Sequence, residues 1–241
     1  MLAKEIENRF IALKNSREAE HLSRFFKTGK GEYGEGDMFL GIKVPVTRSI
    51  VKEYKSRISN NDCIYLIKSD WHEIRLAGFL LLIEQYRKAK KKMDMAASEE
   101  ILSIYLDNLS YGNNWDLVDL VAQYILGDWL VEHPEERNIL DLLASKDDSL
   151  WHQRVAIVST LALIRKGIYS DTIRISEKFL SHKHDLIHKA TGWMLREMGK
   201  RGGYDQLIEF LDKYATVMPR TALRYSIERF PDELRMHYLR K

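Results

Sequence analysis

The sequence predicts an all-α protein in which successive helix pairs stack into an α-solenoid. Apolar residues recur at helical spacing in nearly every segment of the 241-residue chain. Strand signals are nearly absent, because no alternating apolar runs are joined by Asn-Gly or Asp-Gly. Proline is tolerated in the first helical turn, and each of the four prolines stands where a helix can begin: Pro45, Pro134, Pro219 and Pro231. Short connections favour a stack of helix pairs in a single domain, residues 1–241, over an up-and-down bundle.

The expected helices follow one another along the whole chain. Residues 2–14 form the first and residues 17–27 the second. The only glycine-rich loop, residues 28–36, comes next. It lacks the Gly-Lys-Ser/Thr ending of a phosphate-binding loop and no strand precedes it, so we expect a mobile loop and no nucleotide site there. The remaining helices are expected at 46–58, 61–69, 71–90, 97–109, 114–131, 135–145, 149–166, 171–181, 184–199, 204–214, 219–229 and 232–239.

Weak self-similarity indicates internal repeats. The segment Trp71–Ala77 resembles Trp151–Ala156, and residues 186–190 are a fainter copy. The basic residues within these segments are 79 and 35 positions apart, which is about two periods and one period of roughly 40 residues. HEAT-type helical repeats have this period. Their stacking gives a curved array whose concave side is the natural binding surface.

The composition excludes several classes of protein. The chain is 45% hydrophobic and 30% charged, as in a globular protein. No apolar run approaches the roughly 20 residues that cross a bilayer, and the N-terminus lacks the apolar centre of a signal peptide. The single cysteine, Cys63, excludes an internal disulfide and multi-cysteine zinc clusters, and we expect His182, His184 and His188 to be surface histidines. We therefore expect a cytoplasmic monomer with no membrane contact, no metal and no cofactor.

The net charge of +3 conceals an uneven distribution. Residues 99–150 hold 2 basic and 12 acidic residues, whereas the regions on both sides of this segment are basic. Two basic ends can hold a polyanion, although ordinary solvated helix faces produce the same composition more often. The carboxylates of the acidic segment are expected to face outward or to cap helices.

A stretch near the middle of the chain carries the candidate chemistry. Asn113 or Asn114 can cap the helix that follows, and Asp116 in its first turn suits the positive end of the helix dipole. Trp115 and Asp119 are four residues apart and share a helix face. An aromatic ring beside a carboxylate is poor design for a core, because the carboxylate must be solvated or partnered. This pair therefore points to a binding or catalytic surface.

Arg154 and Trp193 are two further candidates. Arg154 lies at the start of a helix, and Trp193 follows Gly192, which interrupts a helix at some cost and suggests the close approach of another group. Taken singly, a tryptophan is more often a core residue and an arginine more often lies on the surface or in an ion pair.

Several motifs, in this spacing, resemble the AlkD-like DNA alkylation repair family. They are Asn114–Asp119, Leu126–Asp128, Leu150–Arg154 and Lys189–Glu197, together with Phe39–Ile42 and the Pro45 and Arg48 that follow it. The resemblance covers about residues 19–229. It implies a right-handed α-solenoid of HEAT-like helix pairs that binds double-stranded DNA in a concave basic groove. It also implies a DNA glycosylase that excises N3- and N7-alkylated purines.

The resemblance further implies roles for single residues. Asp119 would be the catalytic carboxylate, with Trp115 and Trp193 packed against the sugar-phosphate backbone at the lesion. Arg154 would contact a phosphate nearby. The further DNA-binding positions are Arg196, Phe25, Arg48, Lys189, Arg220 and Arg224. Phe25 stands where the family can carry a tyrosine, and the loop at 28–37 is longer than in the best-known members.

The implied chemistry is physically sensible. Alkylation makes the purine cationic and a good leaving group, and breaking its bond to C1′ builds positive charge on the deoxyribose. An ionised Asp119 would stabilise that charge and orient a water, and the base would stay stacked rather than flipped into a pocket. Two alternatives remain: a non-catalytic DNA-binding solenoid and a protein-interaction solenoid. The glycosylase hypothesis requires the two indoles, Arg154 and Asp119 to meet on one surface.

Overall fold

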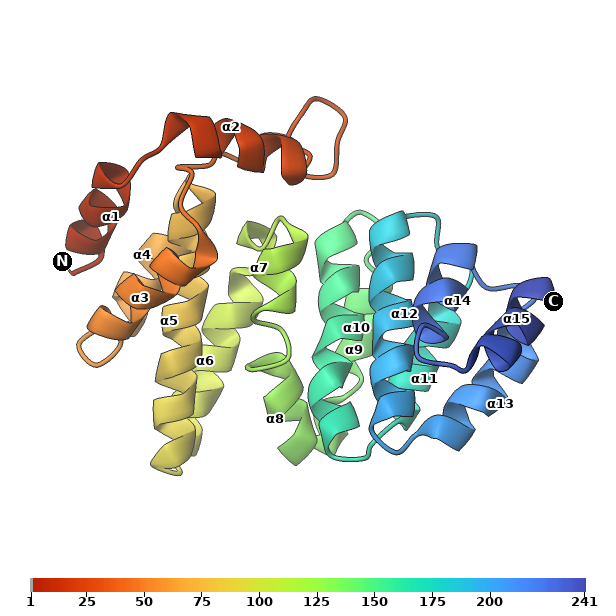
Figure 1. Cartoon of the computed structure of the whole chain (residues 1–241). Helices are drawn as coiled ribbons and strands as arrows, with labels where there is room; N and C mark the ends of the chain where they lie inside the picture. The colour runs from red at the N-terminus through yellow and green to blue at the C-terminus, as the bar shows by residue number, and fades with distance from the viewer. Residues whose placement is uncertain (1) are drawn as a thin grey trace. The chain divides into compact units, whose positions relative to one another are not determined.

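The computed structural model describes residues 2–241, which form helices joined by turns and short loops (Figure 1). Within this range there is no β-strand, only an isolated bridge between Met38 and Trp71. The chain divides into two compact units, one ending at Val121 and the other beginning at Ala122. The predicted all-α class and the repeat-like succession of helix pairs are confirmed. The single domain stays a prediction.

The N-terminal unit is built around its longest helix, α5. This unit contains α1 (Leu2–Ala12), α2 (Ser16–Phe25), α3 (Val44–Tyr54), α4 (Asn60–Ile67), α5 (His72–Lys91), α6 (Met95–Asp107), the 3-10 turn η1 (Leu109–Tyr111) and α7 (Trp115–Asp119). Helices α1, α3, α4, α6 and α7 all contact α5. Every residue of α5 from His72 to Ile83 is consequently buried, which is the pattern of a helix covered on all sides.

The C-terminal unit is organised around α10 and α12. Its elements are α8 (Leu126–Glu132), the 3-10 turn η2 (Pro134–Glu136), α9 (Ile139–Ala144), α10 (Leu150–Arg165), α11 (Ser170–Lys178), α12 (Asp185–Lys200), α13 (Tyr204–Tyr214), α14 (Arg220–Ser226) and α15 (Asp232–Arg240). Helix α10 packs against α8, α9, α11 and α12, and α12 also packs against α13 and α14. Both helices show their full length in Figure 1.

Local sequence accounts for where many helices begin. Side-chain oxygens accept bonds from free backbone N–H groups at the starts of α2, α4, α6 and α10, where the caps are Asn15, Ser59, Asp94 and Ser149. The prolines also stand at helix starts, as predicted: Pro45 in the first turn of α3, Pro134 at the start of η2, and Pro219 and Pro231 just before α14 and α15.

Two glycines let helices cross closely in the C-terminal unit. A Cβ placed on Gly127 in α8 would lie 2.3 Å from the carbonyl oxygen of Ser159 in α10. A Cβ on Gly192 in α12 would lie 2.4 Å from the carbonyl oxygen of Ala222 in α14. The expected close approach to Gly192 is therefore confirmed, and the group that approaches is the backbone of α14.

The helix predicted over residues 114–131 is wrong as a single element, because it is divided into α7 and α8. The backbone N–H of Val121 donates to Val118, three residues back, and that of Gly127 donates to Ala122, five residues back, so the regular ladder is interrupted. Val121, Ala122 and Ile125 are fully buried, so the apolar pattern continues through the break and conceals it. Helix α7 is left with only five residues.

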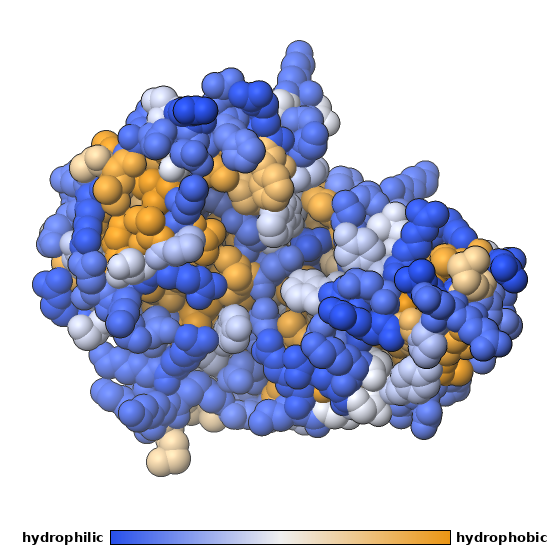
Figure 2. All heavy atoms as spheres, in the orientation of Figure 1, coloured by the Kyte–Doolittle hydropathy of each residue, from blue (hydrophilic) through white to orange (hydrophobic). Residues whose placement is uncertain are grey.

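Most of the acidic segment faces solvent, as expected. The exposed carboxylates are those of Glu99, Glu100, Asp107, Glu132, Glu135, Glu136, Asp147 and Asp148. Hydrophilic side chains cover most of the face seen in Figure 2, and apolar side chains show mainly in the N-terminal unit. No helix of residues 2–241 is long and apolar enough to cross a bilayer. The main exception among the acidic residues is Asp116, which is 6% exposed.

Candidate functional site

Helix α7 holds Trp115 at its first position and Asp119 at its last. The predicted cap is confirmed, because the Oδ1 atom of Asn114 accepts the backbone N–H of Trp115 at 2.9 Å. Both Trp115 and Asp119 are half-buried. The short helix thus carries an indole and a carboxylate one turn apart, and each is partly open to solvent.

Trp115 belongs to a cluster of aromatic side chains. Its ring stacks on Phe26 with centroids 5.2 Å apart and meets Phe25 edge-on at 6.1 Å. Phe26 in turn stacks on Phe39 at 5.0 Å. Phe25, expected to contact DNA, is 56% exposed and forms the outer part of this group. The structure therefore brings Phe25 and Trp115 together at the surface of the N-terminal unit.

Beneath these rings lies a buried chain of charged groups. His72, the first residue of α5, places its Nδ1 atom 2.7 Å from Asp37 Oδ2 and its Nε2 atom 3.0 Å from Asp116 Oδ2. The side chains of His72 and Asp37 are 2% and 0% exposed. The imidazole therefore joins the end of the glycine-rich loop to the first turn of α7.

Arg75 and two asparagines complete this buried network. The Arg75 guanidinium donates to Asp37 and, at 3.0 Å, to Asn113 Oδ1. The Asn114 Nδ2 atom donates to Asp37 Oδ2 at 3.2 Å. Two carboxylates and two cations leave the network balanced in charge, which buried ions require. We call Asp37, His72, Arg75, Asn113, Asn114 and Asp116 the α7 support.

The α7 support keeps His72 protonated. Burial alone would lower the pKa of His72, but the neighbouring carboxylates of Asp116 and Asp37 outweigh it and raise that pKa to about 9. Burial likewise opposes the ionised form of Asp37, but its bond to His72 and the charge of Arg75 hold the pKa of Asp37 below its usual value. The imidazolium is therefore a fixed cation between two carboxylates at neutral pH.

A second buried carboxylate fixes the segment that precedes α3. Glu73 accepts backbone N–H groups from Leu40 at 2.9 Å, Gly41 at 2.8 Å and Ile42 at 3.0 Å. The motif at residues 39–42 is thereby bound to the start of α5. Sequence reasoning missed Glu73 and His72 as anchors. Their position in the repeated segment at 71–77 was the only available signal.

In the C-terminal unit, Arg154 is a buried link between two helices. It is 5% exposed, and its Nη1 atom donates to the carbonyl oxygen of Leu186 in the first turn of α12 at 2.5 Å. Arg75, the basic residue of the similar segment at 71–77, is also buried and donates to the carbonyls of Ser69 and Asp70 at 2.9 Å. The repeat thus preserves an anchoring arginine, and the phosphate contact of Arg154 stays a prediction.

One face of α12 carries three of the expected DNA-binding residues. Lys189, Trp193 and Arg196 are four and three residues apart and so lie on the same side. Trp193 is half-buried. Lys189 pairs with Asp185 at 2.7 Å, and Arg196 pairs with Glu228. These exposed or half-exposed pairs are weak and are broken easily when a phosphate competes.

The other predicted basic residues lie on α3 and α14. Arg48 on α3 and Arg224 on α14 are exposed, and neither has a carboxylate partner among the described residues. Arg220 is also exposed and donates to the Leu239 carbonyl at 2.7 Å. The predicted site residues therefore divide between the two units. Phe25, Arg48, Trp115 and Asp119 belong to the first, and the others belong to the second.

One group of side chains lies close enough together to be a candidate metal site. Among residues 2–241, ligand atoms of His133, Glu135 and Glu136 lie within 4.8 Å of one another. All three already have partners, because His133 Nδ1 faces Glu135 at 3.1 Å and Glu136 accepts the Trp129 Nε1–H at 2.9 Å. Both glutamates are exposed, and exposed acidic groups of this kind are common without a bound ion.

Comparison with known proteins places the chain in a family. Residues 6–230 match the family of DNA alkylation repair enzymes. Among solved structures, the chain is similar to a predicted DNA alkylation repair enzyme from Enterococcus faecalis, with a TM-score of 0.69 and 19% identity, over 91% of this chain and 97% of that one. No curated protein matches. The chain belongs to the DNA alkylation repair enzyme family, which gives it a role in DNA alkylation repair and DNA as its substrate.

Proposed function

We propose that the chain is a monofunctional DNA glycosylase that excises N3- and N7-alkylated purines from double-stranded DNA without a metal or a cofactor. The family match supports the substrate class. The observation that carries the proposal is α7, where Trp115 and Asp119 stand one turn apart, partly open to solvent, on a helix tied into a buried charge network. A surface so firmly supported is suited to hold a carboxylate at a fixed point.

In this proposal Asp119 acts on the sugar. As the cationic purine departs, positive charge develops at C1′ of the deoxyribose. A carboxylate held near that carbon stabilises the charge and orients the water that completes hydrolysis. The departing base is already activated by alkylation, so the carboxylate does not need to donate a proton. The lesion stays stacked in the duplex, and bulky adducts are accepted because no pocket selects the base.

The aromatic rings give the sugar its surroundings. Trp115 and Phe25 form a partly exposed edge beside Asp119, and Phe26 supports the indole from below. Rings packed on the deoxyribose exclude water and attract its developing charge through their π faces. Phe25 has no hydroxyl, so its contact with DNA is through the ring alone.

The C-terminal unit contributes the grip on the backbone. Trp193, Arg196 and Lys189 share a face of α12, and α14 adds Arg220 and Arg224. Arg154 holds the start of α12 through the Leu186 carbonyl and is proposed to reach a phosphate near the lesion. Because these groups belong to one unit and α7 to the other, the proposal requires both units to bind the same stretch of DNA.

The decisive experiment compares two aspartate variants. Asp119→Asn should bind DNA like the wild type but release no 7-methylguanine from methylated duplex DNA. Asp107→Asn, which removes the same charge from an exposed position at the end of α6, should excise normally. Free base is measured by chromatography after incubation. Undiminished excision by Asp119→Asn would remove Asp119 from the mechanism. DNA binding without excision by the wild type would favour the non-catalytic alternative.

A further inference from the structure

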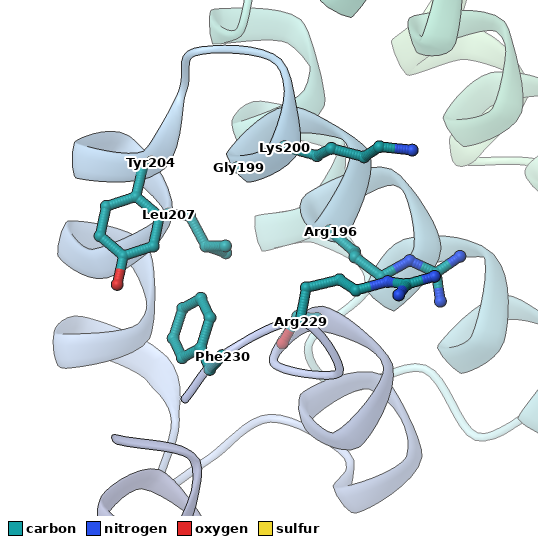
Figure 3. Close-up of a pocket in the computed structure, with 8 residues that line it drawn as sticks. Arg196, Gly199, Lys200, Tyr204, Leu207, Arg229 and Phe230 are labelled. Atoms are coloured by element: carbon teal, nitrogen blue, oxygen red, sulfur yellow. The ribbon is translucent and has the colours of Figure 1, made fainter. Parts of the chain in front are cut away.

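The C-terminal unit contains a pocket that the proposed chemistry does not use. It has a volume of about 390 Å³ and lies between the end of α12, the start of α13 and the segment that follows α14 (Figure 3). Pockets that hold small ligands typically measure roughly 300–1,000 Å³. The side chains that matter here are Arg196, Lys200, Tyr204, Leu207, Arg229 and Phe230.

The inner part of the pocket is apolar and aromatic. Leu207 and Phe230 are 1% and 8% exposed, whereas Tyr204 is 43% exposed and leaves part of its ring open. The rings of Tyr204 and Phe230 have centroids 5.6 Å apart. Gly199 lets Leu207 reach this point, because a Cβ on the glycine would lie 2.6 Å from the Leu207 Cδ2 atom. The wall is thus shaped for a flat apolar group.

The rim of the pocket is cationic. Figure 3 shows the side chains of Arg196, Lys200 and Arg229 pointing to the same side, away from Tyr204. Arg196 is paired with Glu228. Within residues 2–241, neither Lys200 nor Arg229 has a carboxylate within salt-bridge distance, and both are exposed. Two uncompensated cations beside one paired arginine favour a ligand with a negative group at the mouth.

The face of α12 leads from the expected DNA contacts to this pocket. Trp193, Arg196 and Lys200 are three and four residues apart, so they lie along one side of the helix. Since the family acts on DNA and α12 is proposed to carry DNA contacts, a nucleotide is the anion expected on this side of α12.

We propose that the pocket binds a nucleoside phosphate, with the base against Tyr204 and Phe230 and the phosphate on Lys200 and Arg229. Stacking on an aromatic ring accepts any base, and the cations recognise the phosphate. The ligand is either a free nucleotide or an unpaired nucleotide of a DNA strand. The site is separate from Asp119, so it does not rest on the glycosylase activity.

Two binding measurements with the full chain test this proposal and identify the source of the ligand. The first titrates deoxyadenosine monophosphate, with deoxyribose 5-phosphate as the probe that lacks a base. The second compares an undamaged duplex carrying one unpaired 3′ nucleotide with a blunt duplex of equal length. Wild-type protein should prefer the probe with the base and the duplex with the unpaired nucleotide. Tyr204→Ala should weaken both preferences about tenfold.

The variants separate the base from the phosphate. Arg229→Ala should weaken the binding of both deoxyadenosine monophosphate and deoxyribose 5-phosphate. It should also reduce the salt dependence of nucleotide binding, because one phosphate contact is lost. Arg240→Ala, which removes an exposed arginine of α15 outside the pocket, should change neither. Binding of the unpaired nucleotide alone assigns the site to DNA strands, and binding of the free nucleotide alone assigns it to small molecules. Preferences that survive Tyr204→Ala in both measurements would overturn the proposal.

The outcome is independent of the excision assay. Asp119→Asn should bind the nucleotide as the wild type does, and Tyr204→Ala should still release 7-methylguanine from a lesion in the middle of a long duplex. If the wild-type protein excises the base but does not bind the nucleotide, the pocket proposal is wrong and the proposed function stands. If it binds the nucleotide but does not excise the base, the proposed function is wrong and the pocket proposal stands.

Discussion

The buried cation His72 offers the sharpest test of how α7 is held. Its side chain is 2% exposed and lies between two carboxylates, which raise its pKa from 6.5 to about 9. A shift of this size, at about 1.36 kcal/mol for each pKa unit, corresponds to about 3 kcal/mol of folding free energy. Removing one partner of a buried ion pair typically costs about 3–5 kcal/mol, which agrees in order of magnitude.

The sign of the pH dependence follows from the direction of the shift. The folded protein holds the proton on His72 more tightly than the unfolded chain does. The stabilisation is therefore complete below pH 6.5, the unfolded value, and is lost as the pH rises through about 9. Asp37 behaves in the opposite sense. Its folded pKa is lowered, so its contribution is present above the unfolded value and is lost in acid as pH falls through the folded value.

The variant His72→Gln removes the cation while keeping a polar side chain. At pH 6.5 it should lower the free energy of unfolding by about 3 kcal/mol. At pH 9.5 the difference from the wild type should shrink to a small fraction of that value. Urea unfolding followed by circular dichroism measures both, and His21→Gln on the exposed face of α2 is the matched control.

A direct titration gives a second readout of the same prediction. Nuclear magnetic resonance of the His72 ring should show a transition near pH 9 that moves to lower pH in Asp116→Asn, because that substitution removes the carboxylate that raises the pKa of His72 most. A difference in stability between wild type and His72→Gln that is the same at both pH values would refute the reasoning. A His72 transition near the ordinary pKa of 6.5 would also refute the reasoning.

Two further substitutions test packing in the C-terminal unit. Arg154→Ala should lower the free energy of unfolding by about 2 kcal/mol, because the Leu186 carbonyl loses its buried donor. In the same variant, the proposed phosphate contact predicts that the salt slope of DNA binding falls by about one, and an unaltered slope would place Arg154 away from the DNA. Gly192→Ala should lower the free energy of unfolding by about 2 kcal/mol, because the added Cβ would lie 2.4 Å from the Ala222 carbonyl oxygen. An equal or higher melting temperature by differential scanning calorimetry would contradict that close crossing.

Local features of the sequence were sufficient to predict the helical framework. Apolar spacing and the prolines before α14 and α15 depend only on neighbours within a few positions. The Asn114 cap and the position of Trp115 at the start of α7 were predictable for the same reason. The family resemblance, confirmed by the match over residues 6–230, added the substrate class.

The tertiary structure decided which groups support those residues. His72 and Asp116 are 44 positions apart, so no local pattern indicates that they bond. From the local sequence alone, Asp116 is predicted to be an ordinary carboxylate in the first turn of a helix. The break after α7 is also invisible to periodicity, because Val121 and Ala122 keep the apolar pattern while the backbone turns. The spacing of apolar residues indicates which face of a helix can be buried. Contacts between distant segments decide which buried charges meet and where a helix must stop.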